Sequence, residues 1–118
     1  MEQLRTSSFI DAITHDDIVV VDFCAECESC RAFAKTFDAA AKRHGDVAFA
    51  TVDTEQNPEL MAALDIRAIP TVMVFRDSIL VFRRAGALPL GALDDVLDQV
   101  RSLDMVDVRK HVETPRGT

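Results

Sequence analysis

Two spacings of apolar residues run along the chain and predict a mixture of strands and helices. Short apolar or β-branched runs predict strands at 1–4, 18–23, 47–53, 71–75 and 79–82. Apolar residues that recur every three or four positions predict helices around 9–13, at 27–44, at 57–64 and at 90–103. Strands and helices therefore alternate until two strands follow one another after residue 70.

Residues with special backbone preferences mark where these elements begin and end. Thr6 or Ser7 can cap the first helix, and Gly45 can stop the second as a C-cap residue. Pro58 suits the first turn of the third helix, because that position needs no backbone N–H. The dipeptide Asp77-Ser78 separates the last two strands by a spacing that predicts a hairpin.

This order of elements predicts an α/β protein with a central mixed sheet of about four to five strands and about four flanking helices. Crossovers through helices give parallel neighbours, whereas the hairpin gives antiparallel ones. The strands at 18–23 and 47–53 are apolar at nearly every position, so helices must cover both faces of the sheet. We expect one domain over 1–103, followed at 104–118 by an extension that is frayed or partly helical.

Composition narrows the class of protein without changing this architecture. The chain has 118 residues, of which 48% are hydrophobic and 28% charged, as in ordinary globular proteins. A net charge of −7 argues against nucleic acid and anionic membranes as partners, since both require clustered Lys and Arg. The apolar runs are far shorter than the ~20 residues that span a bilayer, and the N-terminus lacks the features of a signal peptide. We expect a cytoplasmic protein that acts as a monomer.

Two of the three cysteines form the motif Cys27-Glu28-Ser29-Cys30, between a predicted buried strand and a predicted helix. A helix N-terminus presents unpaired N–H groups and the positive end of the macrodipole, which favour a thiolate over a thiol. In a cytoplasmic protein such a pair indicates catalysis or metal binding rather than a structural disulfide.

Four further motifs accompany the dithiol in a fixed order. They are Val21-Asp22-Phe23, the run 52–58 ending in Asn57-Pro58, the run 66–71 with its Ile69-Pro70-Thr71, and Ala85-Gly86-Ala87-Leu88. With these motifs the chain resembles the thioredoxin family over about residues 1–103. The resemblance implies a thioredoxin fold and a protein-disulfide reductase that works by dithiol exchange. It implies no cofactor, protein disulfides as substrates, and recharging by an NADPH-dependent thioredoxin reductase.

The resemblance also implies a role for each residue of the dithiol site. Cys27 corresponds to the exposed nucleophile that attacks a substrate disulfide, and Cys30 to the resolving thiol. The two would form the redox disulfide. Asp22 corresponds to the buried carboxylate that accepts the proton of the resolving thiol, with a pKa raised by burial.

A docking surface for the substrate is implied as well. Pro70 corresponds to a cis-proline that faces the dithiol, and the backbone around Ile69 and Thr71 to the segment that pairs with a bound peptide. Ala85, Gly86 and Ala87 would complete this surface, because a missing side chain lets a partner backbone approach closely.

Several positions depart from the family pattern. Cys24 stands where a tryptophan is usual, and Glu28-Ser29 replaces Gly-Pro between the cysteines. Thr51 replaces the lysine usually paired with the buried carboxylate, so Asp22 should be less stabilised as an anion. The acidic Glu26 and Glu28 disfavour a Cys27 thiolate while the helix N-terminus favours it, and the sequence leaves this contest open. We expect a slow reductase rather than a strong oxidant.

Two other functions stay open at this point. The first is a binding module that keeps the fold and the docking surface without catalytic turnover. The second is a metal or iron–sulfur site at Cys24, Cys27 and Cys30, whose spacing resembles part of a cluster-binding run. Such a site needs a fourth ligand, and the three histidines lie in segments with no evident route to it. We expect Cys24 to lie apart from the other two thiols, as a small apolar substitute for tryptophan.

Overall fold

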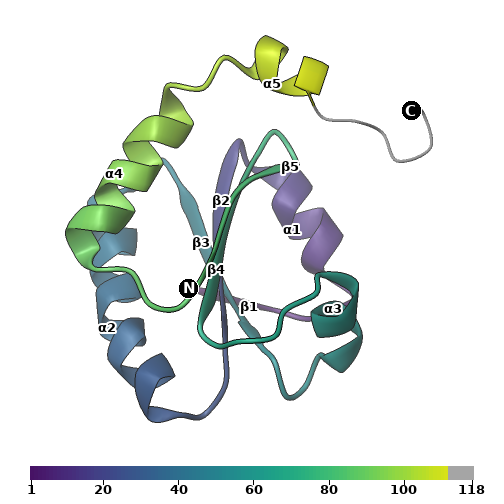
Figure 1. Ribbon diagram of the computed structural model, residues 1–118, viewed down its shortest axis with the longest axis vertical. Helices are drawn as coiled ribbons and strands as arrows, with labels where there is room; N and C mark the ends of the chain where they lie inside the picture. Colours follow the sequence, from purple (N-terminus) through teal and green to yellow (C-terminus); the bar gives the residue numbers. More distant parts are fainter. Residues whose placement is uncertain (112–118) are drawn as a thin grey trace.

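A five-stranded sheet between two layers of helices forms the protein, in a computed structural model that describes residues 1–111 (Figure 1). The elements, in chain order, are β1 (Glu2–Leu4), α1 (Phe9–His15), β2 (Ile18–Cys24), α2 (Glu28–Arg43), β3 (Ala48–Asp53), α3 (Pro58–Ala63), β4 (Thr71–Arg76), β5 (Ile79–Ala85), α4 (Leu90–Arg101) and α5 (Met105–His111). The end of the expected extension, residues 112–118, lies outside the described residues.

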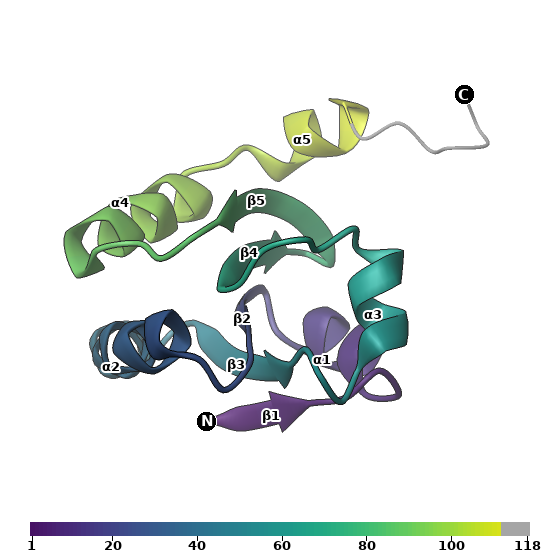
Figure 2. The same ribbon diagram turned by 60° about the horizontal axis from the view of Figure 1, so that its bottom comes forward.

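The strands lie in the order β1-β3-β2-β4-β5 and form the predicted mixed sheet. β3 runs parallel to both β1 and β2, whereas β4 runs antiparallel to β2 and β5 (Figure 2). Phe23 near the end of β2 lies opposite Thr71 at the start of β4, and Thr71 lies opposite Ala85 at the end of β5. The end of β2, the start of β4 and the end of β5, which are distant in sequence, therefore lie side by side at one end of the sheet.

Helices cover both faces of the sheet, as the apolar strands predict. α2 and α4 pack on one face and α1 and α3 lie on the other (Figure 1). The α2 side of the core contains Val20, Phe33, Phe37, Val72, Val74, Leu93 and Leu97. The α1 side contains Phe9, Ile13, Val19, Val21, Phe23, Leu60 and Met73. Alternate residues of β2 belong to different cores, because successive side chains of a strand point to opposite faces.

The ends of some elements differ from the predictions. The N-cap of α1 is Ser8 rather than Thr6 or Ser7, and its side chain makes no capping hydrogen bond. The backbone N–H of Thr6 instead donates to Oδ1 of Asn57, at 2.9 Å, which ties this loop to the start of α3. His44 rather than Gly45 is the C-cap of α2, and its backbone N–H donates to the carbonyl of Ala40.

The C-terminal half of the fold contains more strand and helix than the sequence predicts. Asp77 and Ser78 have φ angles of 52° and 70°, the left-handed pair that a two-residue hairpin requires. The strand after the turn extends to Ala85, beyond the predicted end at residue 82. Within the expected extension, residues 105–111 form α5, and Met105 is buried. In the described part of the chain, no helix combines the length and apolarity needed to cross a bilayer.

Polar contacts fix the far end of α2, the helix that carries the dithiol. Nε2 of His44 lies 2.6 Å from Oδ1 of Asp94 on α4, and Nδ1 of His44 lies 2.8 Å from a guanidinium nitrogen of Arg101. The same guanidinium group donates two hydrogen bonds to Asp46, each 2.9 Å long. These contacts and the packing of Phe33 and Phe37 hold α2 on the sheet.

Candidate active site

Cys27 lies at the junction of a strand and a helix, as the sequence predicts. Its side chain is the N-cap of α2, and Sγ accepts a hydrogen bond of 3.4 Å from the backbone N–H of Cys30. The thiol is partly exposed, so a disulfide in solution can reach it.

The pKa of the Cys27 thiol is lowered from its ordinary value. The hydroxyl of Ser29, 3.3 Å from Sγ, is the main cause, followed by the backbone N–H of Cys30. In the sequence, Ser29 stands out only as part of the replacement between the two cysteines, and the contact of its hydroxyl with Cys27 was missed, although a hydroxyl in the first turn of a helix is a recognisable signal. Glu26 forms an ion pair with Arg31, whose guanidinium group lies 3.8 Å from Oε1 of Glu26. The sequence left open whether Cys27 favours the thiol or the thiolate, and its surroundings in the structure favour the thiolate.

Cys30 has the opposite environment. It is only 4% exposed, and burial raises the pKa of its thiol. Sγ accepts a hydrogen bond of 3.3 Å from the backbone N–H of Ala25 in the short loop before the helix. The dithiol therefore combines one accessible sulfur that ionises readily with one buried sulfur that keeps its proton.

Asp22 is buried on β2, the central strand of the sheet, two residues before Cys24. Its side chain is 3% exposed, and burial raises the pKa of the carboxyl from 3.8 to about 6, against the effect of a hydrogen bond from Cys24. Thr51 lies opposite Asp22 on β3, so no positive charge is supplied from that position. A carboxyl group with this pKa can exchange a proton near neutral pH.

The expectation for Cys24 is wrong. Its thiol is not an isolated apolar group but donates a hydrogen bond to Oδ1 of Asp22, at 3.1 Å, and interacts with the Cys30 thiol. Two positions apart on one strand, Asp22 and Cys24 point to the same face, which is the face that α2 covers. The alternation of side chains along the β2 strand could be read from the sequence. That α2 packs over the end of this strand could not.

The three cysteines do not form a metal centre in this arrangement. Among residues 1–111, no group of three or more His, Cys, Asp or Glu side chains is placed to hold a metal ion. His44 is engaged with Asp94 at the opposite end of α2, and His111 lies on α5.

The implied docking residues come together beside the dithiol loop. The Ile69–Pro70 peptide bond is cis, and the strand register places Pro70 next to the end of β2. The N–H of Gly86 donates to the carbonyl of Pro70, at 2.7 Å, and Gly86 has a φ of 106°, which favours glycine. Ile69, Ala85 and Ala87 are exposed, whereas Thr71 is buried with its hydroxyl bonded to the carbonyl of Ala68.

Two cavities flank the start of α2. One of about 380 Å³ is mainly apolar and is lined by Ser29, Ala32, Phe33, Thr36, Ala87, Leu88 and Pro89. The other, of about 170 Å³, is lined by Gln3, Cys24, Ala25, Glu26, Thr51, Val52 and Asp53. The first extends from Ser29, between the two cysteines, to Ala87 of the implied docking surface, and the second reaches Cys24 from the β3 side.

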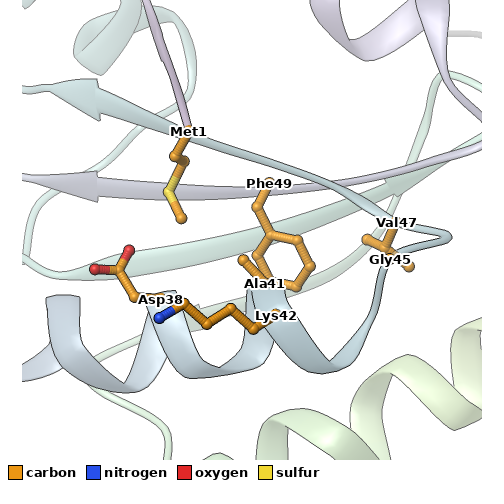
Figure 3. A pocket seen from close by; sticks show the side chains of 7 residues that line it. All are labelled: Met1, Asp38, Ala41, Lys42, Gly45, Val47 and Phe49. Atoms are coloured by element: carbon orange, nitrogen blue, oxygen red, sulfur yellow. The ribbon is translucent and has the colours of Figure 1, made fainter.

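A third cavity lies away from this chemistry. It has a volume of about 400 Å³ and lies between α2 and the β1 edge of the sheet, where Met1, Asp38, Lys42 and Phe49 contribute side chains (Figure 3). It contains no cysteine among its lining residues. The reactive groups are therefore concentrated at the other end of α2.

A mixed sheet with a dithiol at a helix N-terminus, a buried carboxyl group and a cis-proline at the end of the neighbouring strand is typical of redox proteins of the thioredoxin-like α/β class. The sequence model of the thioredoxin family matches residues 1–99. The chain belongs to the thioredoxin family, and its general role is that of an oxidoreductase.

Relatives and solved structures agree with this assignment. Putative thioredoxin 2 of Streptomyces coelicolor is 43% identical over 111 residues, which cover 93% of this chain and 83% of that protein. Thioredoxin C-3 of Corynebacterium nephridii is 38% identical, over 82% of this chain and 68% of that protein. The crystal structure of chloroplastic thioredoxin z superimposes with a TM-score of 0.80 at 25% identity, covering 87% of this chain and 96% of that one.

Proposed function

We propose that the protein is a thiol–disulfide oxidoreductase that reduces protein disulfides through Cys27 and Cys30. The observation that carries the proposal is the difference between the two thiols. Cys27 is accessible and its pKa is lowered, whereas Cys30 is buried and its pKa is raised. A thiolate attacks a disulfide faster than a thiol does, so the Cys27 sulfur attacks the substrate and the Cys30 sulfur reacts only in the later, resolving step.

The reaction has two exchange steps. The Cys27 thiolate attacks one sulfur of the substrate disulfide, which forms a Cys27–substrate disulfide and releases the other substrate sulfur as a thiolate. Cys30 then loses its proton toward Asp22 and attacks Cys27. This step forms the Cys27–Cys30 disulfide and breaks the bond to the substrate. Two electrons pass to the substrate, and the protein becomes oxidised.

The surface beside the dithiol suits an extended peptide. Ile69 is a large apolar residue that is 36% exposed, and it lies directly before the cis-proline. Ala85 and Ala87 present only small side chains next to the apolar cavity at the start of α2. In our proposal the peptide backbone lies along residues 69–71 and 85–87, and a side chain next to its disulfide enters that cavity.

The physiological setting follows from the same proposal. The protein needs no cofactor of its own, because both electrons are stored in the dithiol. An NADPH-dependent thioredoxin reductase restores the dithiol, and the protein works as a monomer in the cytoplasm without nucleic acid or membrane. The lowered Cys27 pKa favours faster attack than the slow reductase that the sequence led us to expect, and it is the quantity that sets the rate.

The test is catalysis of insulin disulfide reduction by dithiothreitol. We expect the wild type to accelerate it and Cys27→Ser to abolish the acceleration. Ala34→Ser is the matched control, because it adds a hydroxyl on an exposed position of the same helix. Acceleration that survives Cys27→Ser would refute the proposal. A wild type without turnover that binds a partner as tightly as Cys27→Ser/Cys30→Ser would identify a binding module.

A further inference from the structure

Cys24 is a thiol that the two exchange steps do not use, although it lies among the groups that carry them out. Its sulfur lies 3.1 Å from Oδ1 of Asp22 and interacts with the Cys30 thiol. Asp22 and Cys24 share one face of β2, and Cys30 is on the helix packed over that face. The Cys24 thiol is therefore placed between the Asp22 carboxyl group and the Cys30 thiol.

The resolving step requires a path for a proton. Cys30 must lose its proton before it attacks Cys27, and among the described residues Asp22 is the buried side chain with a carboxylate that can accept it. In the described residues, the hydrogen bond of the Asp22 side chain comes from Cys24, and Cys30 makes no side-chain hydrogen bond to Asp22. The Cys24 and Cys30 thiols affect each other's pKa, but no hydrogen bond joins them in the described part of the chain, so a proton can pass between them only if the Cys30 thiol turns toward Cys24. The backbone N–H of Ala25 already occupies one side of the Cys30 sulfur.

We propose that Cys24 relays the proton from Cys30 to Asp22 during the resolving step. The Cys24 thiol gives its proton to the Asp22 carboxylate while its sulfur receives the proton of Cys30. Cys24 ends as a neutral thiol, Asp22 ends protonated, and Cys30 becomes the thiolate that attacks Cys27. No atom or electron is gained or lost by Cys24. The inference rests on the proposed function, since it concerns the second of its two steps.

The environment of Cys24 favours a relay over a nucleophile. Burial is the main cause that raises the pKa of its thiol far above the ordinary value, and the neighbouring Asp22 and Cys30 add to the effect. A thiol that seldom ionises does not attack disulfides. It still passes protons, because a relay needs one donor and one acceptor at the same atom.

The experiment separates the two exchange steps in time. The reduced protein is mixed with less than one equivalent of the chromogenic disulfide 5,5′-dithiobis(2-nitrobenzoate). Attack by Cys27 releases the first thionitrobenzoate, and attack by Cys30 releases the second. Cys30→Ser gives only the first phase and so identifies the second. Loss of the first phase in wild type would contradict the proposed function, whatever happens at Cys24.

The relay predicts different outcomes for two substitutions at one position. Cys24→Ala should slow the second phase by on the order of tenfold or more at pH 7 and leave the first phase unchanged. Cys24→Ser keeps a group that both donates and accepts, so its second phase should stay close to that of wild type. An alanine variant with a wild-type second phase would overturn the proposal. So would a serine variant as slow as the alanine one, because both then report only altered packing.

The pH profile tests whether the proton passes to Asp22. In wild type, the rate of the second phase should rise with a midpoint near the Asp22 pKa of about 6, and Cys24→Ala should lose this dependence. Asp53 lies opposite Cys24 on β3, Glu26 lines the same cavity, and Val72 on β4 carries no charge. Asp53→Asn and Glu26→Gln are therefore controls that should keep the midpoint.

A double variant completes the test. If Cys24 acts through Asp22, Cys24→Ala/Asp22→Asn should be no slower than the slower single variant. Multiplicative slowing would show two independent roles and overturn the relay. Peptide mapping of the oxidised protein tests whether Cys24 instead takes part in a disulfide. A Cys24–Cys30 disulfide in place of Cys27–Cys30 would also overturn the relay.

Discussion

Replacing the buried carboxyl group by its isosteric amide, Asp22→Asn, should make the protein more stable at neutral pH. The folded protein holds the Asp22 proton up to a pH of about 6, whereas the unfolded chain releases it near 3.8. Burial of the charged form therefore lowers the free energy of unfolding as pH rises through this range. The penalty is absent below pH 3.8 and complete above pH 6, and asparagine does not incur it.

The size of the effect follows from the two pKa values. Each pKa unit is worth about 1.4 kcal/mol, so the change from 3.8 to about 6 corresponds to about 3 kcal/mol. Asp22 is 3% exposed, so solvent does little to screen this penalty. The hydrogen bond from Cys24 survives in the variant, because the amide oxygen of asparagine also accepts.

Urea unfolding of both proteins between pH 4 and 7, with the thiols kept reduced, measures the effect. The free energy of unfolding of Asp22→Asn should exceed that of wild type by an amount that grows by about 2 kcal/mol across the range, because part of the penalty is already present at pH 4. Asp95→Asn, which removes an exposed carboxylate on α4, is the control and should run parallel to wild type. Parallel curves for Asp22→Asn would refute the reasoning, because they would mean that Asp22 titrates alike in both states.

Two further predictions concern the residues around the dithiol. Ser29→Ala removes the main cause that lowers the Cys27 pKa, so alkylation of Cys27 by iodoacetamide at slightly acidic pH should become slower. An unchanged rate would contradict this role. Gly86→Ala should cost about 1–3 kcal/mol of stability, because φ is 106° there, although a Cβ meets open space. Gly91→Ala, also in open space but within α4, should instead stabilise by about 0.5–1 kcal/mol, and equal effects at both glycines would exclude backbone strain as the cause.

Local patterns were sufficient for the elements and for the position of the reactive thiol. The apolar run that became β2 and the helical spacing after Cys27 place a cysteine at a helix N-terminus whatever the rest of the chain does. The turn at Asp77-Ser78 joined two strands as predicted, because a short connection leaves few alternatives. Capping residues were less well predicted, since Thr6 bonds to the distant Asn57 instead of starting α1.

The sequence by itself determined that a dithiol stands between a buried strand and an amphipathic helix, because strand and helix periods depend only on neighbouring residues. Tertiary structure decided which side chains surround that dithiol. The register of β2 with β4 brings Pro70 to the end of β2, and the packing of α2 covers the face of β2 that carries Asp22 and Cys24. Burial raises the pKa of Asp22, against the opposing effect of the hydrogen bond that Cys24 donates to it. Burial and long-range proximity depend on how all the elements pack, so the composition of one segment cannot specify them.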